Sequence, residues 1–218
     1  MINTECRTDQ TAEAAEYAAS VLKNGGLVVF PTETVYGLGA LLSATDAVHR
    51  IYEIKGRDEK KPLSILIGNT EQMEELAPAS EERKAAMRLA EAFWPGPLTV
   101  VLPKTGIVPD IVTAGGSTVG FRMPVHQFAL ELLHAAGEPV VTTSANLSGQ
   151  PAAVSAEEAI RALDGKVELI IAGGECPVQV PSTVVGLQED GILIFREGII
   201  SEEQIRHALS NAYMEKDE

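Results

Sequence analysis

The chain of 218 residues has few cysteines, few aromatic residues and no long apolar run, and each shortage excludes a class of protein. Its two cysteines, Cys6 and Cys176, lie far apart and have no neighbours at metal-ligand spacing, which favours two reduced thiols over a disulfide framework. No apolar stretch approaches the roughly 20 residues that span a bilayer, and the N-terminus lacks the apolar core of a signal peptide. We therefore expect a cytoplasmic protein that does not enter a membrane.

Basic residues are scarce as well. The chain has 17 lysines and arginines against 31 aspartates and glutamates, a formal net charge of −14, and only 5% of its residues are aromatic. Both features weigh against a surface that binds nucleic acid, since such surfaces need positive charge and often stacking rings. One segment departs from this average, because basic residues outnumber acidic ones between positions 50 and 61. It indicates either a confined anion site or a solvated helix end of alternating charge.

The common catalytic signatures are missing. The chain has no Gly-x-Ser-x-Gly elbow, no phosphate loop ending in Gly-Lys-Ser/Thr and no Gly-x-Gly-x-x-Gly fingerprint. Its histidines form no metal-spaced pair, so we assign no metal ligand from a protein side chain. Glu33 is a candidate general base, and acceptance of backbone hydrogen bonds beside a turn is its alternative role. Nothing in the sequence requires covalent catalysis.

Hydrophobic periodicity predicts an α/β protein. Helical spacing from Ala14 to Leu22 ends at Gly25-Gly26, and an apparent capping box at 43–46 opens a helix that Gly56 ends. Further helices are expected over 70–76, 80–93, 126–135, 155–163 and 201–213, with 70–76 and 80–93 exposed. Strands are expected over 27–30, 63–67, 98–102, 117–122, 140–143 and 167–171, with a hairpin of 183–187 and 191–196.

These elements predict a twisted mixed β-sheet surrounded by helices, because helix-linked strands occur together with a hairpin. The length suffices for one substantial α/β domain. No repeat, low-complexity tract or linker interrupts the chain, so we expect a single domain over residues 1–218 that ends in an acidic tail at 214–218.

The most informative stretch is Pro-Thr-Glu-Thr-Val-Tyr-Gly-Leu-Gly-Ala at 31–40, directly after the apolar run 27–30. Pro31 breaks the strand, and three hydrogen-bonding side chains follow at 32–34. The glycines Gly37 and Gly39 permit close approaches that a Cβ would block. Since open α/β sheets bind ligands at the carboxyl ends of strands, this stretch predicts a small polar substrate site. A polar turn without function is the alternative.

Three further segments repeat this pattern of small hydroxyl residues at a strand end. They are 142–146, 181–183, and Thr118 together with Arg122, while Arg196 ends the last strand. Hydroxyl groups and exposed amides bind carboxylate or phosphate oxygens, and arginine adds permanently charged, bidentate donors. Each segment alone is typical of a cap or turn. Their joint occurrence indicates an anion-binding site.

A set of ordered segments resembles the YrdC-like family from about residue 10 to residue 205. They are Pro-Thr-Glu-Thr-Val-Tyr-Gly-Leu-Gly (31–39), Lys-Gly-Arg (55–57), Lys-Pro-Leu (61–63), Trp-Pro-Gly-Pro-Leu-Thr (94–99), Phe-Arg-Met-Pro (121–124), Thr-Ser-Ala-Asn-Leu-Ser-Gly (143–149), Pro-Ser-Thr-Val-Val (181–185) and Arg-Glu-Gly (196–198). The resemblance implies a single-domain YrdC-like fold with a large open concave site.

The resemblance also implies an activity. The family joins L-threonine, bicarbonate and ATP, which brings Mg²⁺, into threonylcarbamoyl-AMP with release of diphosphate. This is the first step of threonylcarbamoyladenosine formation in tRNA, and a tRNA-modifying threonylcarbamoyl transferase complex completes it. The family is often described as binding double-stranded RNA, so an RNA-binding module without catalysis is one rival hypothesis. A relative that forms carbamoyl-AMP is another. We expect tRNA itself to bind only weakly or indirectly.

The matching motif positions assign roles to individual residues. By resemblance, threonine contacts fall on Thr34, Arg122, Thr142 and Ser182, and nucleotide contacts on Arg57, Lys61, Thr118, Ser144, Asn146 and Arg196. Lys55 and Arg57, the charged pair of the Lys-x-Arg motif, are the expected catalytic residues. Three positions depart from the family pattern: Leu66, where many relatives have histidine, Gly186, which follows Pro-Ser-Thr-Val-Val in place of aspartate, and Lys61, which replaces the asparagine common in longer members.

Overall fold

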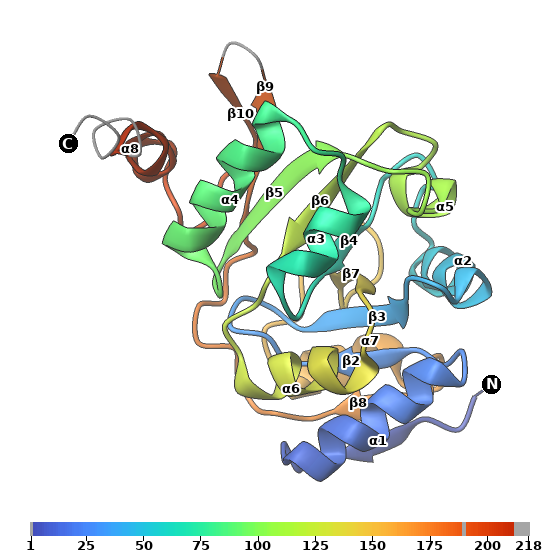
Figure 1. Ribbon diagram of the computed structural model, residues 1–218. Coiled ribbons are helices and arrows are strands. Elements are labelled where there is room, and N and C mark those ends of the chain that lie inside the picture. The colour runs from blue at the N-terminus through green and yellow to red at the C-terminus, as the bar shows by residue number, and fades with distance from the viewer. Residues whose placement is uncertain (1, 189–190, 212–218) are drawn as a thin grey trace.

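The computed structural model describes residues 2–188 and 191–211, which form a ten-stranded mixed sheet with helices on both faces (Figure 1). The strands are β1 (Glu5–Arg7), β2 (Val28–Phe30), β3 (Gly37–Leu41), β4 (Ser64–Leu66), β5 (Leu98–Pro103), β6 (Thr118–Arg122), β7 (Val140–Ser144), β8 (Leu169–Ile171), β9 (Thr183–Gln188) and β10 (Gly191–Arg196). The helices are α1 (Ala12–Lys23), α2 (Thr45–Lys55), α3 (Thr70–Leu76), α4 (Glu81–Phe93), α5 (Asp110–Thr113), α6 (Gln127–Ala136), α7 (Ala156–Leu163) and α8 (Glu202–Asn211).

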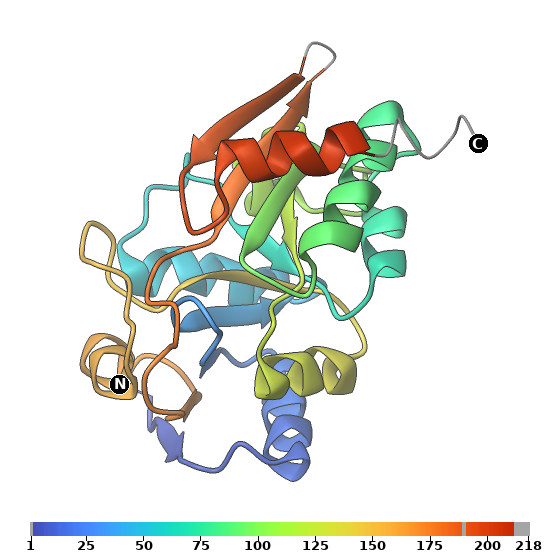
Figure 2. The same ribbon diagram turned by 90° about the vertical axis from the view of Figure 1, so that its left-hand side faces the viewer.

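The strands lie in the order β1-β8-β2-β3-β7-β4-β6-β5-β9-β10. Four neighbouring pairs are parallel (β1–β8, β2–β8, β4–β6 and β5–β9), and the others are antiparallel. This confirms the mixed α/β sheet that the sequence predicts. Figure 2 shows α8 lying across the β9–β10 end of the sheet, where it packs on α4.

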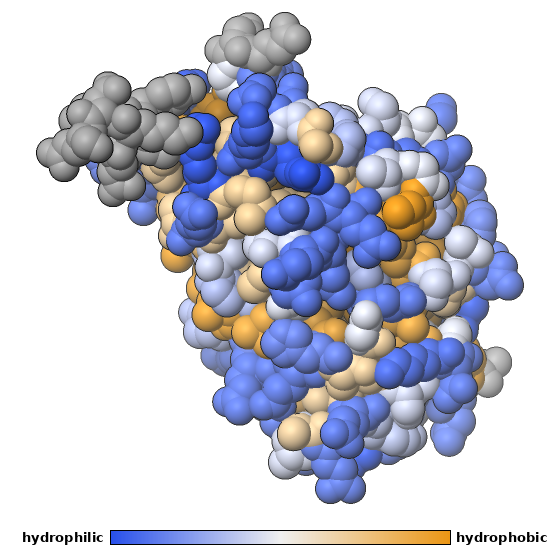
Figure 3. Space-filling view, viewed as in Figure 1, coloured by the Kyte–Doolittle hydropathy of each residue, from blue (hydrophilic) through white to orange (hydrophobic). Residues whose placement is uncertain are grey.

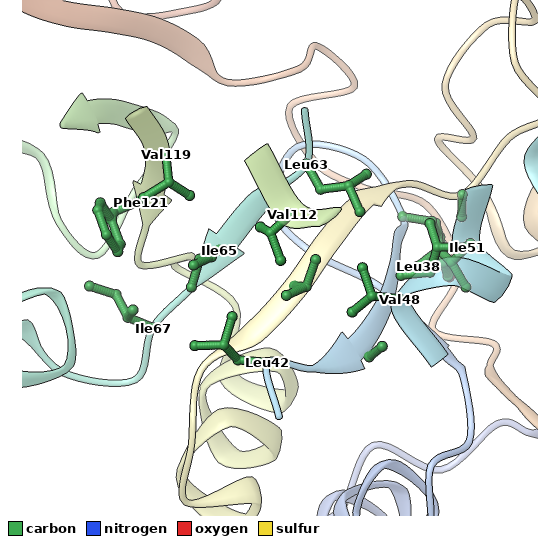
Figure 4. Packing of buried hydrophobic residues seen from close by; sticks show 14 of the residues in the cluster. Leu38, Leu42, Val48, Ile51, Leu63, Ile65, Ile67, Val112, Val119 and Phe121 are labelled. Carbon is green, nitrogen blue, oxygen red and sulfur yellow. The ribbon is translucent and has the colours of Figure 1, made fainter. Parts of the chain in front are cut away.

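Two apolar clusters fill the two faces of the sheet. Neighbouring residues of one strand point to opposite faces, so Ile65 and Val141 join one cluster while Leu66 and Val140 join the other. The first cluster packs β3, β4 and β6 against α2 and α5, with Phe121 and Ile51 among its members (Figure 4). The second packs β2 and β8 against α1 and α6. The core thus lies in two layers with the sheet between them.

Local signals explain most helix ends. The side chains of Thr11, Asn69, Ser80 and Ser155 accept a hydrogen bond from the first turn of α1, α3, α4 and α7. The capping box expected at the start of α2 is wrong. Its N-cap is Ala44, without a side-chain bond, because the Ser43 amide and hydroxyl donate to Glu138 Oε1 instead. Gly56 ends α2 in the left-handed conformation, as expected.

The main difference from the sequence-based expectation is β3, where the second half of the 31–40 stretch is a strand and not a loop. Gly37 and Gly39 belong to this buried strand, since a Cβ at Gly39 would lie 2.7 Å from Val140 Cγ1 and 3.0 Å from Phe30 Cε1. Strand β1 and the short helix α5 were also not expected. The turn at 189–190 and the end of the predicted helix 201–213 lie outside the described residues.

The face of the molecule shown in Figure 3 is mainly hydrophilic, with apolar residues in patches among polar side chains. Within residues 2–188 and 191–211, no helix is long and apolar enough to cross a membrane. Cys6 is exposed, Cys176 is buried, and both thiols are free.

Candidate active site

A cavity of about 420 Å³ lies over the middle of the sheet. Its floor consists of alternate residues of neighbouring strands, such as Ser64 and Leu66 of β4 and Thr142 and Ser144 of β7. These residues share the sheet face that α1 and α6 cover further along, because Leu66 also packs in their cluster. The cavity therefore begins where this helical cover ends.

Small side chains explain why there is a cavity on this face of the sheet. Strand register places Thr142 opposite Ser64, Ser64 opposite Gly120, and Gly120 opposite Val101. The row continues to Gly186 of β9. Large residues of the same strands, such as Phe121, face the opposite layer. Thr142, Ser64 and Gly120 of three neighbouring strands are thus small or polar and leave room for a ligand, while the buried face keeps the strands fixed.

Three arginines give the cavity a positive charge within an acidic chain. Arg57, Arg122 and Arg196 line it, and no described aspartate or glutamate does. Burial lowers the pKa of Arg57, and burial together with the charge of Arg122 lowers the pKa of Arg196. Guanidinium groups that repel one another in a partly dry site favour an anion between them.

Arg196 belongs to a hydrogen-bonded chain that reaches across β9. Its Nε donates to the Ser182 backbone oxygen at 2.9 Å, and its Nη2 donates to Ser182 Oγ at 3.1 Å. Ser182 Oγ shares a 2.8 Å hydrogen bond with Thr99 Oγ1 of β5. The chain fixes an arginine and two hydroxyl groups in the wall of the cavity.

Arg122 is held by contacts with Gly96 and Glu33. Its Nε donates to the Gly96 backbone oxygen at 3.2 Å, and its Nη2 lies 2.7 Å from Glu33 Oε1. Thr142 Oγ1 donates to the Leu38 backbone oxygen. The expected alternative role of Glu33, acceptance of backbone bonds, is wrong, because neither carboxylate oxygen has a hydrogen-bond partner among the described residues.

The Lys-x-Arg and Ser-x-Asn motifs meet in space. Lys55 Nζ donates to the backbone oxygens of Ser144 and Asn146 and lies 3.3 Å from Asn146 Oδ1, which also accepts from Ser144 Oγ. Burial, reinforced by the charge of Arg57, lowers the pKa of Lys55 to about 7. Lys55 thus ties the end of α2 to the end of β7.

The structure gathers most of the expected site residues around the cavity. Those that line it are Arg57, Thr118, Arg122, Thr142, Ser144, Ser182 and Arg196. Lys55, Lys61, Thr34 and Asn146 are not among the lining residues. Thr34 is fully buried and shares a 3.0 Å hydrogen bond with Thr32, which does line the cavity. The Lys61 backbone oxygen accepts from Arg57 Nε.

Several lining residues received no role from the sequence, among them Ser64, Thr99 and Phe195. Thr99 was detectable as a polar residue that alternates with the buried Leu98 and Val100 of β5. Phe195 carries no such signal, since an aromatic residue in a strand is usually part of a core. Its side chain is instead 59% exposed at the edge of the cavity.

Within the described residues, no group of three histidine, cysteine, aspartate or glutamate side chains is placed to bind a metal ion. The lining supplies hydroxyl groups, backbone groups and guanidinium groups. This chemistry suits carboxylate and phosphate groups.

Comparison with known proteins places the chain in a family. The sequence model of the Sua5/YciO/YrdC family, described as "Telomere recombination", matches residues 20–198, and the chain belongs to this family. It is 46% identical to the threonylcarbamoyl-AMP synthase of Pyrococcus abyssi over 192 residues, which cover 88% of this chain and 56% of that relative. Identity to the threonylcarbamoyl-AMP synthase of Bacillus subtilis is 43% over 201 residues, covering 91% of this chain and 57% of the relative.

The fold comparison agrees. The crystal structure of P. abyssi Sua5 complexed with L-threonine superimposes with a TM-score of 0.87 and 43% identity, covering 95% of this chain and 60% of that one. The family resemblance and the fold are thereby confirmed. The chain spans little more than half the length of these curated relatives.

Proposed function

We propose that this protein is a threonylcarbamoyl-AMP synthase, which joins L-threonine, bicarbonate and ATP and releases diphosphate. The observation that carries the proposal is a cavity with three arginines and several hydroxyl groups in a chain whose relatives bear this name. The relative crystallised with L-threonine supports threonine as one substrate.

The proposed chemistry needs no protein nucleophile. The amine of threonine attacks carbon dioxide and loses a proton, or attacks the carbon of bicarbonate with loss of water, and either route forms N-carboxy-threonine. An oxygen of this new carboxylate then attacks the α-phosphorus of ATP, and the bond to diphosphate breaks. Both steps join reactants that carry negative charge, so the main tasks of the protein are positioning and charge neutralisation.

The residues divide into two groups under this proposal. Arg122, Thr142 and Ser182 contact threonine, with Thr34 acting from behind the cavity wall, because it bonds to the lining residue Thr32. Arg57, Thr118, Ser144 and Arg196 contact the nucleotide, while Lys55 and Asn146 hold the loop that carries Ser144. Lys61 supports Arg57 through its backbone oxygen.

Magnesium enters the proposal as part of the MgATP substrate. The cavity lining offers no described carboxylate for an ion, so the phosphate oxygens of ATP would bind it. The product would then pass to a tRNA-modifying threonylcarbamoyl transferase complex, and we place the protein in the cytoplasm.

A substrate-omission experiment tests the function. Purified protein is incubated with MgATP, bicarbonate and one amino acid, and diphosphate release is measured. We expect full release only when threonine and bicarbonate are both present. Serine should react more slowly but still measurably, because one missing methyl contact costs only about 1 kcal/mol and cannot exclude it. Equal release with alanine, or no release with threonine, would contradict the proposal.

A further inference from the structure

A cluster of buried polar groups lies behind the cavity wall, around Glu33. This residue follows β2 and is only 4% exposed. Its carboxylate faces the guanidinium of Arg122, with 2.7 Å between Oε1 and Nη2, and both side chains are less than 10% exposed. The two residues thus form an ion pair in the protein interior. Of the two, Arg122 lines the cavity and Glu33 does not.

Hydrogen bonding in this cluster is incomplete. Glu33 Oε1 and Oε2, Arg122 Nη2 and His126 Nδ1 are all buried without an aligned partner among the described residues. The short contact between Glu33 and Arg122 is therefore one of charge and packing, without the alignment of a hydrogen bond. Buried polar atoms without partners are rare in folded proteins, so a concentration of them calls for an explanation such as a functional role or a bound water.

Within this cluster, the positive charge of Arg122 balances the negative charge of Glu33. Burial lowers the pKa of His126, against the opposing effect of Glu33, which leaves this imidazole neutral at pH 7. Burial raises the pKa of the Cys176 thiol to about 11, so this group is neutral as well. Arg122 is then the cation that compensates Glu33. Removing one partner of such a pair leaves the other charge buried and uncompensated.

We propose that Glu33 is the positioning residue of Arg122, and this inference rests on the proposed function. Gly96 fixes Nε of the guanidinium and Glu33 fixes Nη2, while Nη1 makes no hydrogen bond to a described residue. Since Nε is bonded and Nη2 is buried against Glu33, Nη1 is the donor that this lining residue has left for the cavity, where it would bind the carboxylate of the amino-acid substrate. A carboxylate that does not line the cavity acts through Arg122 and not as a general base.

The kinetic test compares Glu33→Gln, Glu33→Asp, Arg122→Lys and the double variant Glu33→Gln/Arg122→Lys. For Glu33→Gln we expect the threonine KM to rise at least 10-fold while the ATP KM stays within about 2-fold. The double variant should have the threonine KM of Arg122→Lys alone, because coupled residues are not additive. Glu33→Asp keeps the negative charge, so its threonine KM should lie between those of the wild type and Glu33→Gln.

The matched control is Glu168→Gln, which removes the carboxylate of the Arg50–Glu168 ion pair, neither residue of which lines the cavity. This variant should lose thermal stability but keep both KM values. If Glu33→Gln likewise loses stability without a change in threonine KM, or if the two single effects multiply in the double variant, the role is structural and the inference is wrong.

A readout without turnover separates this inference from the proposed function. In ¹⁵N-arginine NMR spectra, the Nε–H signal of Arg122, identified by its loss in Arg122→Lys, should shift in Glu33→Gln and stay unchanged in Glu168→Gln. If the wild-type protein releases no diphosphate with threonine, the function fails, and a shifted signal still supports positioning. An unshifted signal overturns the positioning role whatever the activity.

Discussion

The ring of Phe195 occupies the space that a side chain on Gly186 would need. A Cβ at Gly186 would lie 2.7 Å from Phe195 Cε2 and 3.3 Å from its Cζ. Gly186 is the position where the family pattern has aspartate, so this departure has a structural partner on the neighbouring strand. The glycine lets the ring lie over β9 at the edge of the cavity.

This relationship predicts a coupled effect on stability. Gly186→Asp should lower the melting temperature, at a cost below the roughly 1–3 kcal/mol of core overpacking, because the exposed ring can move aside. The same substitution in a Phe195→Ala background should cost much less, because the ring is gone. Thermal denaturation of the four proteins measures the difference. Equal losses in both backgrounds would show that the ring and the glycine are independent.

Phe195 itself should serve the nucleotide under the proposed function. An exposed ring beside Arg196 offers a face on which a base can stack, and such contacts are worth about 1–3 kcal/mol. Phe195→Ala should therefore raise the ATP KM at least 5-fold and leave the threonine KM unchanged. Phe195→Tyr, which keeps a ring, is the control. A shift in threonine KM alone would place the ring on the other substrate.

Arg57→Ala should slow diphosphate release about 30- to 1,000-fold, because a charge-assisted contact in the transition state is worth roughly 2–4 kcal/mol. Arg57→Lys should recover only part of this, since the planar fork is lost. The side chain is half-buried and donates to the Lys61 and Pro62 oxygens, so we also expect a stability loss of about 1 kcal/mol.

The control for Arg57 is Arg161→Ala, on the exposed side of α7. Arg83 is unsuitable, although the sequence places it on an exposed helix, because its Nη1 donates to the Glu74 and Ala77 oxygens. Arg161→Ala should leave activity and stability intact. Full turnover by Arg57→Ala would remove this residue from the proposed site.

Lys55 should make stability depend on pH. Its pKa is about 7 in the folded protein and near its ordinary 10.5 when unfolded, so between these values the unfolded chain binds more protons. Stability therefore rises as pH increases from 7 to 10, relative to a variant without this group. We expect the melting-temperature difference between wild type and Lys55→Met to shift in favour of wild type from pH 7 to pH 9. A constant difference would mean that the ammonium form persists, stabilised by its oxygen partners.

The net charge of −14 predicts weak binding to tRNA. Filter binding or fluorescence anisotropy with unmodified tRNA should show low affinity that falls further with added salt. Tight binding that persists at about 200 mM salt would reveal a basic surface and would favour the RNA-binding hypothesis.

The sequence by itself determined the class of fold and most of the site. Apolar periodicity placed the long helices and strands because burial of one face is a local pattern, and the motifs named most of the residues that line the cavity. The sequence pattern did not predict β3, because two glycines after a polar stretch are typical of a loop. The need for glycine in this strand comes from the close packing of Phe30 and Val140, which only the folded structure shows.

The tertiary structure decided which residues act together. The Glu33–Arg122 pair, the Thr99–Ser182–Arg196 chain and the contact of Lys55 with the 144–146 loop join segments that are remote in sequence. Such pairings depend on strand order and register, because β5 lies beside β9 and β4 beside β7. Neither composition nor spacing along one chain contains that information, since long-range contacts are fixed only when the whole sheet assembles.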